Sequence, residues 1–405
     1  MVEAKNNNNN INEDNSVPKI DIQNVHWIDL FVDYMLQNKP CILKTSATKN
    51  WRSRKEWVLD TTGTNQQQLP NFDYFAEKYG DLVGPLYDEE NCEQTTIQVS
   101  QYVQYAKNGD FHEGIKYLKD WHFQKDSGTS YEFYSLPSFL QFDWINNEEW
   151  SDTDGSPFGD YRFVYFGIKD TWTIFHSDVM SSYSWSANIC GRKLWYFVPL
   201  GNECYFKEYR DTYVKDIRDR KENWEKAKVI SFIQEPGEIV FVPANWYHQV
   251  HNLEDAISIN HNFFNSSNID RAFEMICSRL QDVRNEIDDV RNVFTEQEFN
   301  DSCQKILQAD IRINFDMLQS LVKSVASDRR KKCNKCCVCP KHKNIFACKK
   351  DVECMKHMKN YVKDSCCCDD SGLLCNSCIN FANMYSLTCS SQIEYMISKY
   401  LKEMV

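Results

Sequence analysis

The sequence lacks any apolar run long enough to cross a bilayer, and it does not begin with a signal peptide. Residues 1–10 are polar and rich in asparagine, which is typical of a disordered tail and not of a secretion signal or a membrane anchor. Basic residues are in the minority, with 46 lysines and arginines against 58 acidic residues and a net charge of −12. These absences argue against a membrane protein and predict an intracellular one. We expect it in the cytoplasm, with the nucleus as the alternative.

The length and the aromatic content favour one large β-rich domain with additions. An aromatic share of 14% in 405 residues is typical of a thick sheet sandwich. Residues 207–222 carry mixed charges, which fits either a solvated helix or a loop on the substrate side. We expect the chain to divide into a disordered Asn-rich tail (1–18), a mixed α/β segment packed on a barrel (19–155), the barrel (156–265), helices (266–330), a cysteine-rich module (331–390) and a terminal helix (391–405).

Two histidines and one carboxylate stand out on strand-like sequence. His176 and Asp178 end the segment Thr173-Trp-Thr-Ile-Phe-His-Ser-Asp178, and the period of two in a strand would put both on one face. His248 follows a hydrophobic run and a turn, and a rolled antiparallel sheet would bring it opposite the pair. A lone His-x-Asp is a weak signal, but two histidines and a carboxylate form the donor set of a non-haem Fe(II) oxygenase, with positions left open for a co-substrate and dioxygen.

A lysine begins the strand-like segment after the first two candidate ligands. Lys193 lies in Gly191-Arg-Lys-Leu-Trp-Tyr-Phe-Val-Pro199. If its side chain points into an apolar barrel it needs an anion, and the far carboxylate of 2-oxoglutarate would supply one. The alternative interpretation, a solvated lysine at a strand edge, has about equal weight because lysine is usually exposed.

The chain resembles the JmjC family of Fe(II)- and 2-oxoglutarate-dependent oxygenases from about residue 25 to about residue 330. The resemblance rests on five motifs in the same order: Asp160-Tyr-Arg-Phe-Val-Tyr165, Phe175-His-Ser-Asp178, Cys190-Gly-Arg-Lys193, Gln249-Val-His-Asn-Leu253 and Ile257-Ser-Ile-Asn-His-Asn262. It implies a mainly β fold with helices, a double-stranded β-helix of the jelly-roll or cupin type, with N-terminal α/β elements and C-terminal helices. It also implies that His176, Asp178 and His248 are the iron ligands and the catalytic centre.

The same resemblance implies the co-substrate site. Lys193 matches the partner of the 2-oxoglutarate carboxylate, and Thr173 matches the hydroxyl beside it. Ser182, Ser186, Tyr131 or Tyr134 could supply that hydroxyl instead, and Asn260 is a further pocket candidate. His251 and His261 do not follow the Trp-Tyr pair that precedes His248, so we interpret both as structural.

Within the JmjC family, the motifs resemble a group of protein lysyl hydroxylases. The resemblance implies hydroxylation of the eukaryotic translation termination (release) factor, on the lysine of its Asn-Ile-Lys-Ser motif. Two other functions stay open: a JmjC oxygenase with another target, such as a histone lysine or an RNA base, and a non-catalytic metal-binding scaffold. Intact metal ligands and Lys193 argue against the scaffold.

Cysteine is concentrated beyond the region of resemblance. Twelve of the eighteen cysteines fall between Cys333 and Cys389, and Cys333, Cys336, Cys375 and Cys378 form two Cys-x-x-Cys pairs. This spacing favours a zinc module over a thiol-rich tail without a fold, although it matches no finger type cleanly. The segment from Arg329 to Lys359 carries eleven basic and two acidic residues, so contact with nucleic acid through this tail is a further hypothesis, although no aromatic stacking platform accompanies it.

Overall fold

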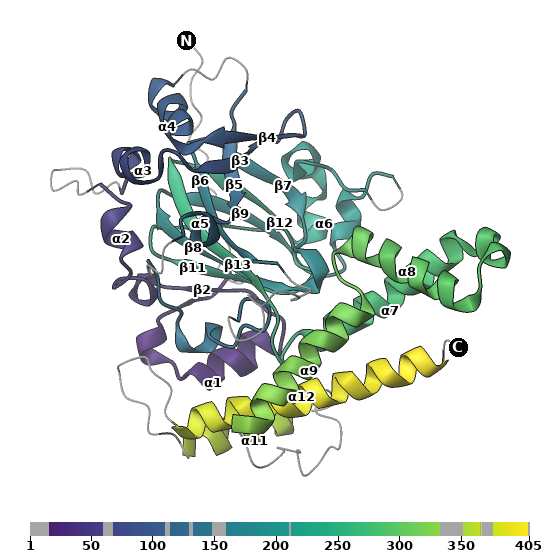
Figure 1. Ribbon diagram of the computed structural model, residues 1–405. Coiled ribbons are helices and arrows are strands. Elements are labelled where there is room, and N and C mark those ends of the chain that lie inside the picture. The colour runs from purple at the N-terminus through teal and green to yellow at the C-terminus, as the bar shows by residue number, and fades with distance from the viewer. Residues whose placement is uncertain are drawn as a thin grey trace.

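Two mainly antiparallel sheets form the centre of the molecule, with α3 (Phe72–Tyr79) and α4 (Val99–Asn108) at one end and the C-terminal helices at the other (Figure 1). The computed structural model describes residues 16–59, 68–109, 114–128, 133–147, 159–209, 212–332, 351–364, 366 and 376–403. Among these residues, no helix has both the length and the apolar character needed to cross a membrane.

Eight consecutive strands between Arg162 and Phe263 form the barrel. Four of them, in the order β11, β8, β13, β6, belong to the larger sheet, and the other four, in the order β10, β9, β12, β7, form the smaller sheet. This alternation of successive strands between two facing four-stranded sheets is a double-stranded β-helix, so the predicted fold class is confirmed. The strands are β6 (Arg162–Gly167), β7 (Trp172–His176), β8 (Tyr183–Cys190), β9 (Lys193–Val198), β10 (Ile230–Gln234), β11 (Ile239–Val242), β12 (Tyr247–Asn252) and β13 (Ala256–Phe263).

The N-terminal segment lengthens the larger sheet at both edges. Strands β1 (Lys19–Ile20) and β2 (Cys41–Leu43) join it beside β11, while β5 (Tyr117–Trp121), β3 (Val83–Asp88) and β4 (Glu93–Gln98) follow β6. The helices of this segment are α1 (Trp27–Leu30), α2 (Ser53–Glu56), α3 (Phe72–Tyr79), α4 (Val99–Asn108) and α5 (Phe123–Asp126). Aromatic side chains such as Trp57, Trp121 and Trp185 fill the core between these elements and the sheet.

Local sequence explains how the barrel strands turn. Gly191 has a φ of +72°, and a Cβ atom there would lie 2.3 Å from the carbonyl oxygen of Asp255. Only glycine fits such a position, so the chain can turn sharply from β8 into β9. The turn places Lys193 as the first residue of β9, which pairs with β12 in the same sheet that carries His176 and His248.

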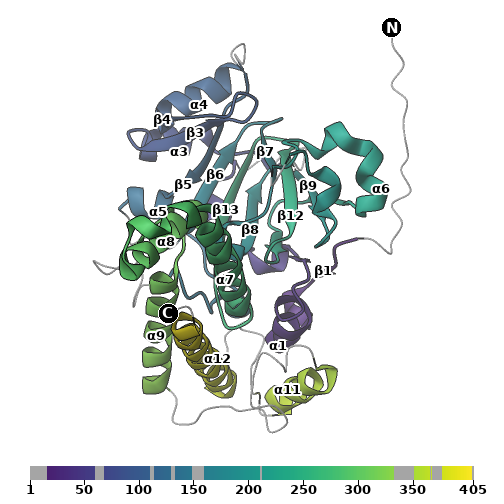
Figure 2. The same ribbon diagram turned by 90° about the vertical axis from the view of Figure 1, so that its right-hand side faces the viewer.

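Within the described residues, five longer helices follow the barrel, and Figure 2 shows how they are arranged. They are α7 (Ile269–Glu286), α8 (Glu296–Ile311), α9 (Phe315–Lys332), α11 (Val352–Asp364) and α12 (Asn376–Glu403). A capping box between Thr295 and Glu298 begins α8, as expected for a helix start. Both views show α12 alongside α9 and α11 beside α1, so the end of the chain packs against its beginning.

Candidate active site

The sheet register brings the three candidate metal ligands together. His248 on β12 is paired directly with His176 on β7, and the centroids of the two imidazole rings are 4.4 Å apart. Asp178 follows two residues after His176, at the end of β7. One donor atom from each of the three residues lies within 4.8 Å of the others, which is the spacing of ligands around one metal ion.

Backbone carbonyls fix both imidazole rings in the orientation that a metal needs. Nδ1 of His176 lies 2.7 Å from the carbonyl oxygen of Ile174, and Nδ1 of His248 lies 2.9 Å from that of Trp246. A carbonyl only accepts, so each Nδ1 carries the proton and donates it. Each Nε2 therefore keeps a lone pair directed at the common centre, as in metal-binding histidines generally.

A serine on the next strand along the chain holds the carboxylate of Asp178. The hydroxyl of Ser184 on β8 donates a 2.6 Å hydrogen bond to Oδ2 of Asp178. Beyond Asp178 the backbone enters the left-handed region at Met180 and Ser181, with φ of 60° and 53°. Ser181 donates a 2.8 Å hydrogen bond to the side chain of Asn245, so the loop after Asp178 is tied to the turn before His248. This link fixes the carboxylate relative to the second histidine.

Burial keeps the first histidine neutral. Burial, with a smaller contribution from the neighbouring His248, lowers the pKa of His176 to about 4, while Asp178 opposes the shift. A neutral imidazole is the form that binds a metal, so no proton has to leave this ring near pH 7 when iron arrives.

A cavity of about 850 Å³ opens over the three ligands. Its walls include Trp195, whose ring stacks on that of His248 at 5.7 Å, and Val250. These two residues form an apolar part of the wall beside His248. The volume is enough for a small dicarboxylate together with the end of a substrate side chain.

Lys193 points into this cavity and is only 2% exposed, so the interpretation as a solvated strand edge does not hold. Its Nζ donates a 2.7 Å hydrogen bond to the hydroxyl of Ser258, and Nδ2 of Asn260 donates to the same oxygen at 3.1 Å. Burial lowers the pKa of Lys193 to about 7. Among the described residues Lys193 makes no ion pair, so a carboxylate that enters the cavity could pair with its ammonium.

The other predicted co-substrate residues also line the cavity. Thr173, Ser186 and Asn260 all lie in its wall together with Lys193. The oxygen of Thr173 accepts a 3.2 Å hydrogen bond from the backbone N–H of Val250, which leaves its own proton to donate. Sequence reasoning missed Ser258, although it stands two residues before Asn260 on the same strand and so on the same face.

Comparison with known proteins agrees with this geometry. The JmjC domain family, described as "JmjC domain, hydroxylase", matches residues 163–263. The protein "2-oxoglutarate and iron-dependent oxygenase JMJD4" of Gallus gallus is 35% identical over 326 residues, covering 76% of this chain and 74% of that protein. The JMJD4 protein of Homo sapiens is 32% identical, with 75% and 74% covered. "Arginine-specific demethylase JMJ20" of Arabidopsis thaliana is also 32% identical, with 79% and 74% covered.

The chain belongs to the JmjC family of iron- and 2-oxoglutarate-dependent oxygenases. Its donor set fits the iron, because two imidazole nitrogen donors and one carboxylate face one point and leave the cavity side open. Its buried lysine fits the co-substrate, because a dicarboxylate could reach both that point and the ammonium across the same cavity.

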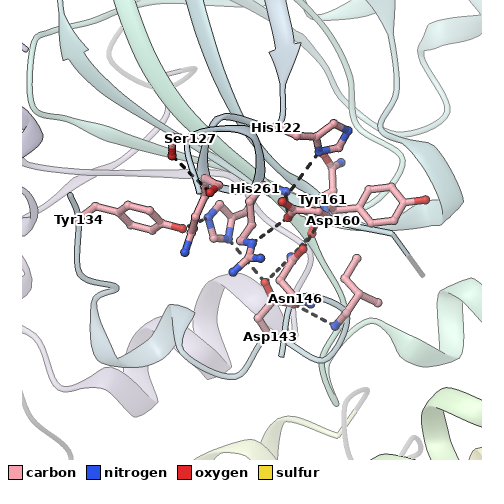
Figure 3. A network of polar contacts seen from close by, with 12 residues as sticks. His122, Ser127, Tyr134, Asp143, Asn146, Asp160, Tyr161 and His261 are labelled. Atoms are coloured by element: carbon pink, nitrogen blue, oxygen red, sulfur yellow. Dashed lines mark hydrogen bonds and ion pairs between the residues drawn. The ribbon is translucent and has the colours of Figure 1, made fainter. Parts of the chain in front are cut away.

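Two further histidines of the JmjC domain are engaged elsewhere. His251 stacks on Trp172 with ring centroids 5.7 Å apart, and its Nε2 lies 2.8 Å from the side-chain nitrogen of Gln249. His261 is 2% exposed and lies between Tyr134 and Asp143, as Figure 3 shows, with the hydroxyl of Tyr134 2.7 Å from its Nε2. These contacts agree with a structural role for both.

The alternative hydroxyls are also accounted for. Tyr134 contacts His261 and is absent from the cavity wall, and Tyr131 lies outside the described residues. Ser182 is also absent from the cavity wall, and its oxygen accepts a hydrogen bond from Asn262 at 3.1 Å. Thr173 and Ser186 therefore remain as hydroxyls beside Lys193.

Of the four candidate zinc ligands, Cys378 alone lies in the described part of the chain. Cys333, Cys336 and Cys375 lie outside the described residues. Cys378 is buried near the start of α12, a helix that runs from Asn376 to Glu403 and so begins before the terminal helix expected over 391–405.

Proposed function

We propose that this protein is a protein hydroxylase in which His176, Asp178 and His248 hold Fe(II) and form the catalytic centre. The observation that carries the proposal is the convergence of two imidazole rings, each with its Nδ1 on a backbone carbonyl, and one serine-held carboxylate on a single point beside a cavity. An arrangement of this kind is typical of non-haem iron oxygenases, because it leaves open positions on the metal.

Lys193 and its neighbours would bind the co-substrate. The ammonium of Lys193, held by Ser258, and the hydroxyl of Thr173 would bind the far carboxylate of 2-oxoglutarate, with Ser186 and Asn260 along the same wall. Bound iron and 2-oxoglutarate supply the oxidation: one atom of dioxygen goes to the substrate C–H bond, and the other goes to succinate as carbon dioxide leaves. The protein supplies position and a dry cavity, and none of its side chains acts as a nucleophile.

A lysine of the eukaryotic translation termination (release) factor is the substrate that we propose. The resemblance of the sequence motifs to release-factor lysyl hydroxylases supports it. Part of the cavity wall would suit a cationic substrate, since the wall includes Tyr117, Tyr161 and Tyr165 together with Asp120. The same wall also contains the cations Lys119, Lys125 and Arg312. Asp120 accepts a hydrogen bond from Tyr165 and makes no ion pair within the described residues, so it could receive an ammonium group.

Mass spectrometry tests reaction and substrate together. Recombinant release factor would be incubated with this protein, Fe(II), ascorbate and 2-oxoglutarate, with the His176→Ala variant as control and a release factor with arginine at the motif lysine as a second control. We expect one added oxygen on the motif lysine, and none in either control. Succinate without that oxygen would mean that the iron centre is right and the substrate is wrong. Neither product would favour the non-catalytic scaffold.

A second candidate is demethylation, which the similarity to the Arabidopsis protein named an arginine-specific demethylase favours. Hydroxylation of an N-methyl group gives an unstable product that releases formaldehyde, so the same centre could serve both reactions. Methylated arginine and lysine peptides, including histone tails, would separate the two candidates. Loss of a methyl group with formaldehyde release would support demethylation.

Three finer proposals accompany this function. Release factors work on cytoplasmic ribosomes, so we propose a cytoplasmic location. Zinc in the cysteine-rich segment and nucleic-acid contact by its basic residues stay predictions, because residues 333–350 lie outside the described part of the chain. RNA as a substrate has no support in the cavity beyond its aromatic groups.

A further inference from the structure

Three metal-binding side chains meet far from the candidate iron site. His26 precedes α1, Cys366 lies between α11 and α12, and Cys378 lies in the first turn of α12. Nε2 of His26 is 3.0 Å from Sγ of Cys366 and 3.9 Å from Sγ of Cys378, and the two sulfur atoms are 3.4 Å apart. The cluster joins residues that are up to 352 positions apart in the sequence.

We propose that His26, Cys366 and Cys378 bind a structural zinc ion that joins the two ends of the chain. Zinc bonds of about 2.3 Å to sulfur and about 2.0 Å to nitrogen, arranged tetrahedrally, put neighbouring donor atoms roughly 3.5 to 3.8 Å apart. The observed distances of 3.0, 3.4 and 3.9 Å lie on both sides of that range. Three protein donors leave one position of the tetrahedron for another ligand. This proposal uses no residue of the candidate iron site, so it stands apart from the proposed function.

Independent contacts bring the same segments together. Nζ of Lys359 on α11 lies 2.7 Å from Asp33 and 3.2 Å from Asp29, and Nζ of Lys363 lies 2.9 Å from Asp29. These ion pairs fix α11 against the beginning of the chain. Cys366 lies two residues after the end of α11, so the ion pairs of α11 bring it close to His26 independently of any metal.

Other pairings of the three side chains fit less well. A disulfide would need sulfur atoms about 2.0 Å apart, well below the observed 3.4 Å. A plain hydrogen bond from imidazole to thiol would explain His26 and Cys366, but not why a third donor, the fully buried Cys378, converges on the same point.

Zinc would change one local contact. Nδ1 of His26 lies 3.2 Å from the backbone N–H of Ile28, as an acceptor that caps α1. With zinc on Nε2 the proton moves to Nδ1, so the imidazole ring has to turn from this long contact. One helix cap contributes far less free energy of stabilisation than a structural zinc site, so losing the cap on zinc binding is still favourable.

Metal analysis of the full-length protein tests the proposal. Zinc per chain would be measured for the wild type, for His26→Ala and Cys366→Ser, and for the matched controls Cys92→Ser and Cys204→Ser, whose thiols are exposed. Because one site holds one ion, we expect about one zinc fewer per chain in the two site variants and no loss in the controls. Cobalt substitution would add a thiolate-to-metal absorption band, which the sulfur-free iron site cannot produce.

A measurement on the wild type guards against variants that fail to fold. Cys366 and Cys378 would be alkylated with and without a zinc chelator, and each site would be read by mass spectrometry. Faster alkylation of both after chelation would support the site. Equal zinc content in all variants, together with alkylation that the chelator does not change, would overturn it.

Discussion

The ammonium of Lys193 donates a 2.7 Å hydrogen bond to the hydroxyl of Ser258 from a position that water hardly reaches. One of its three donors is thereby used, and two remain for an incoming carboxylate. The buried lysine thus has a fixed direction before 2-oxoglutarate binds. Its charge state, and not only its position, should govern co-substrate affinity.

The affinity for 2-oxoglutarate is expected to fall as pH rises above about 7. Burial lowers the pKa of Lys193 to about 7, and a bound carboxylate would raise it again. Binding above that pH therefore takes up a proton, and the dissociation constant should rise by up to about tenfold per pH unit. Calorimetry in buffers of different ionisation heat measures both effects.

Lys193→Ala provides the control for this pH dependence. The variant should bind 2-oxoglutarate weakly at every pH and without proton uptake, while its iron affinity stays near that of the wild type. A wild-type dissociation constant that is constant from pH 6 to pH 9 would show that the lysine is charged before the co-substrate arrives.

Ser184→Ala should weaken iron binding without removing a ligand. Ser184 donates to Oδ2 of Asp178, and the loss of such a supporting hydrogen bond typically costs about 10- to 100-fold in metal affinity. Fe(II) titration under anaerobic conditions measures the change. Ser231→Ala, at an exposed position of β10, is the matched control. An unchanged iron affinity in Ser184→Ala would mean that the sheet alone orients the carboxylate.

His176→Ala should abolish both iron binding and succinate formation, since two donors cannot retain the metal in catalytic use. His357→Ala, at an exposed histidine of α11, is expected to retain both. Iron content and 2-oxoglutarate turnover are measured on the same preparations. Full turnover in His176→Ala would remove the iron assignment.

The protein should lose stability in mild acid, in part through His251. Burial lowers the pKa of His251 to about 4, with Arg218 contributing, whereas an unfolded histidine titrates near 6.5. Between these values the unfolded chain binds more protons, so the free energy of unfolding falls as pH falls. From pH 7 to pH 5 this one residue should contribute about 2 kcal/mol of the loss.

Urea unfolding of His251→Phe at the two pH values tests this estimate. Phenylalanine keeps a ring beside Trp172 but has no proton to gain, so the variant should lose about 2 kcal/mol less than the wild type between pH 7 and pH 5. His357→Ala should lose as much as the wild type. An equal loss in all three proteins would assign the acid sensitivity to other groups.

The sequence predicted those parts of the site that follow from strand periodicity and from ordered motifs. His176, Asp178 and His248 belong to this group, and so does the fold class. Sequence reasoning left Lys193 undecided between the interior and a strand edge, because period two alone does not say which face is buried. The burial of Lys193 in the cavity wall decides that question.

Contacts between distant segments could not be predicted in the same way. Ser258 was missed because the sequence around a serine in a strand does not indicate which side chain its hydroxyl will contact. The meeting of His26 with Cys366 and Cys378 depends on how α11 docks on α1, through ion pairs that neither segment reveals alone. The cysteine spacing suggested zinc but pointed to the Cys-x-x-Cys pairs, because only cysteines that are close in the sequence form a recognisable motif.

The order of strands in the larger sheet has a consequence for synthesis on the ribosome. Strand β2 pairs with β11, so the edge of β2 at Ile42 stays unpaired until Val240 has been synthesised. At about 5 to 20 residues per second, the nascent chain carries that open edge for roughly 10 to 40 seconds. Unpaired apolar edges of this kind are prone to aggregate, so the early part of this chain is a natural client for chaperones that bind nascent polypeptides.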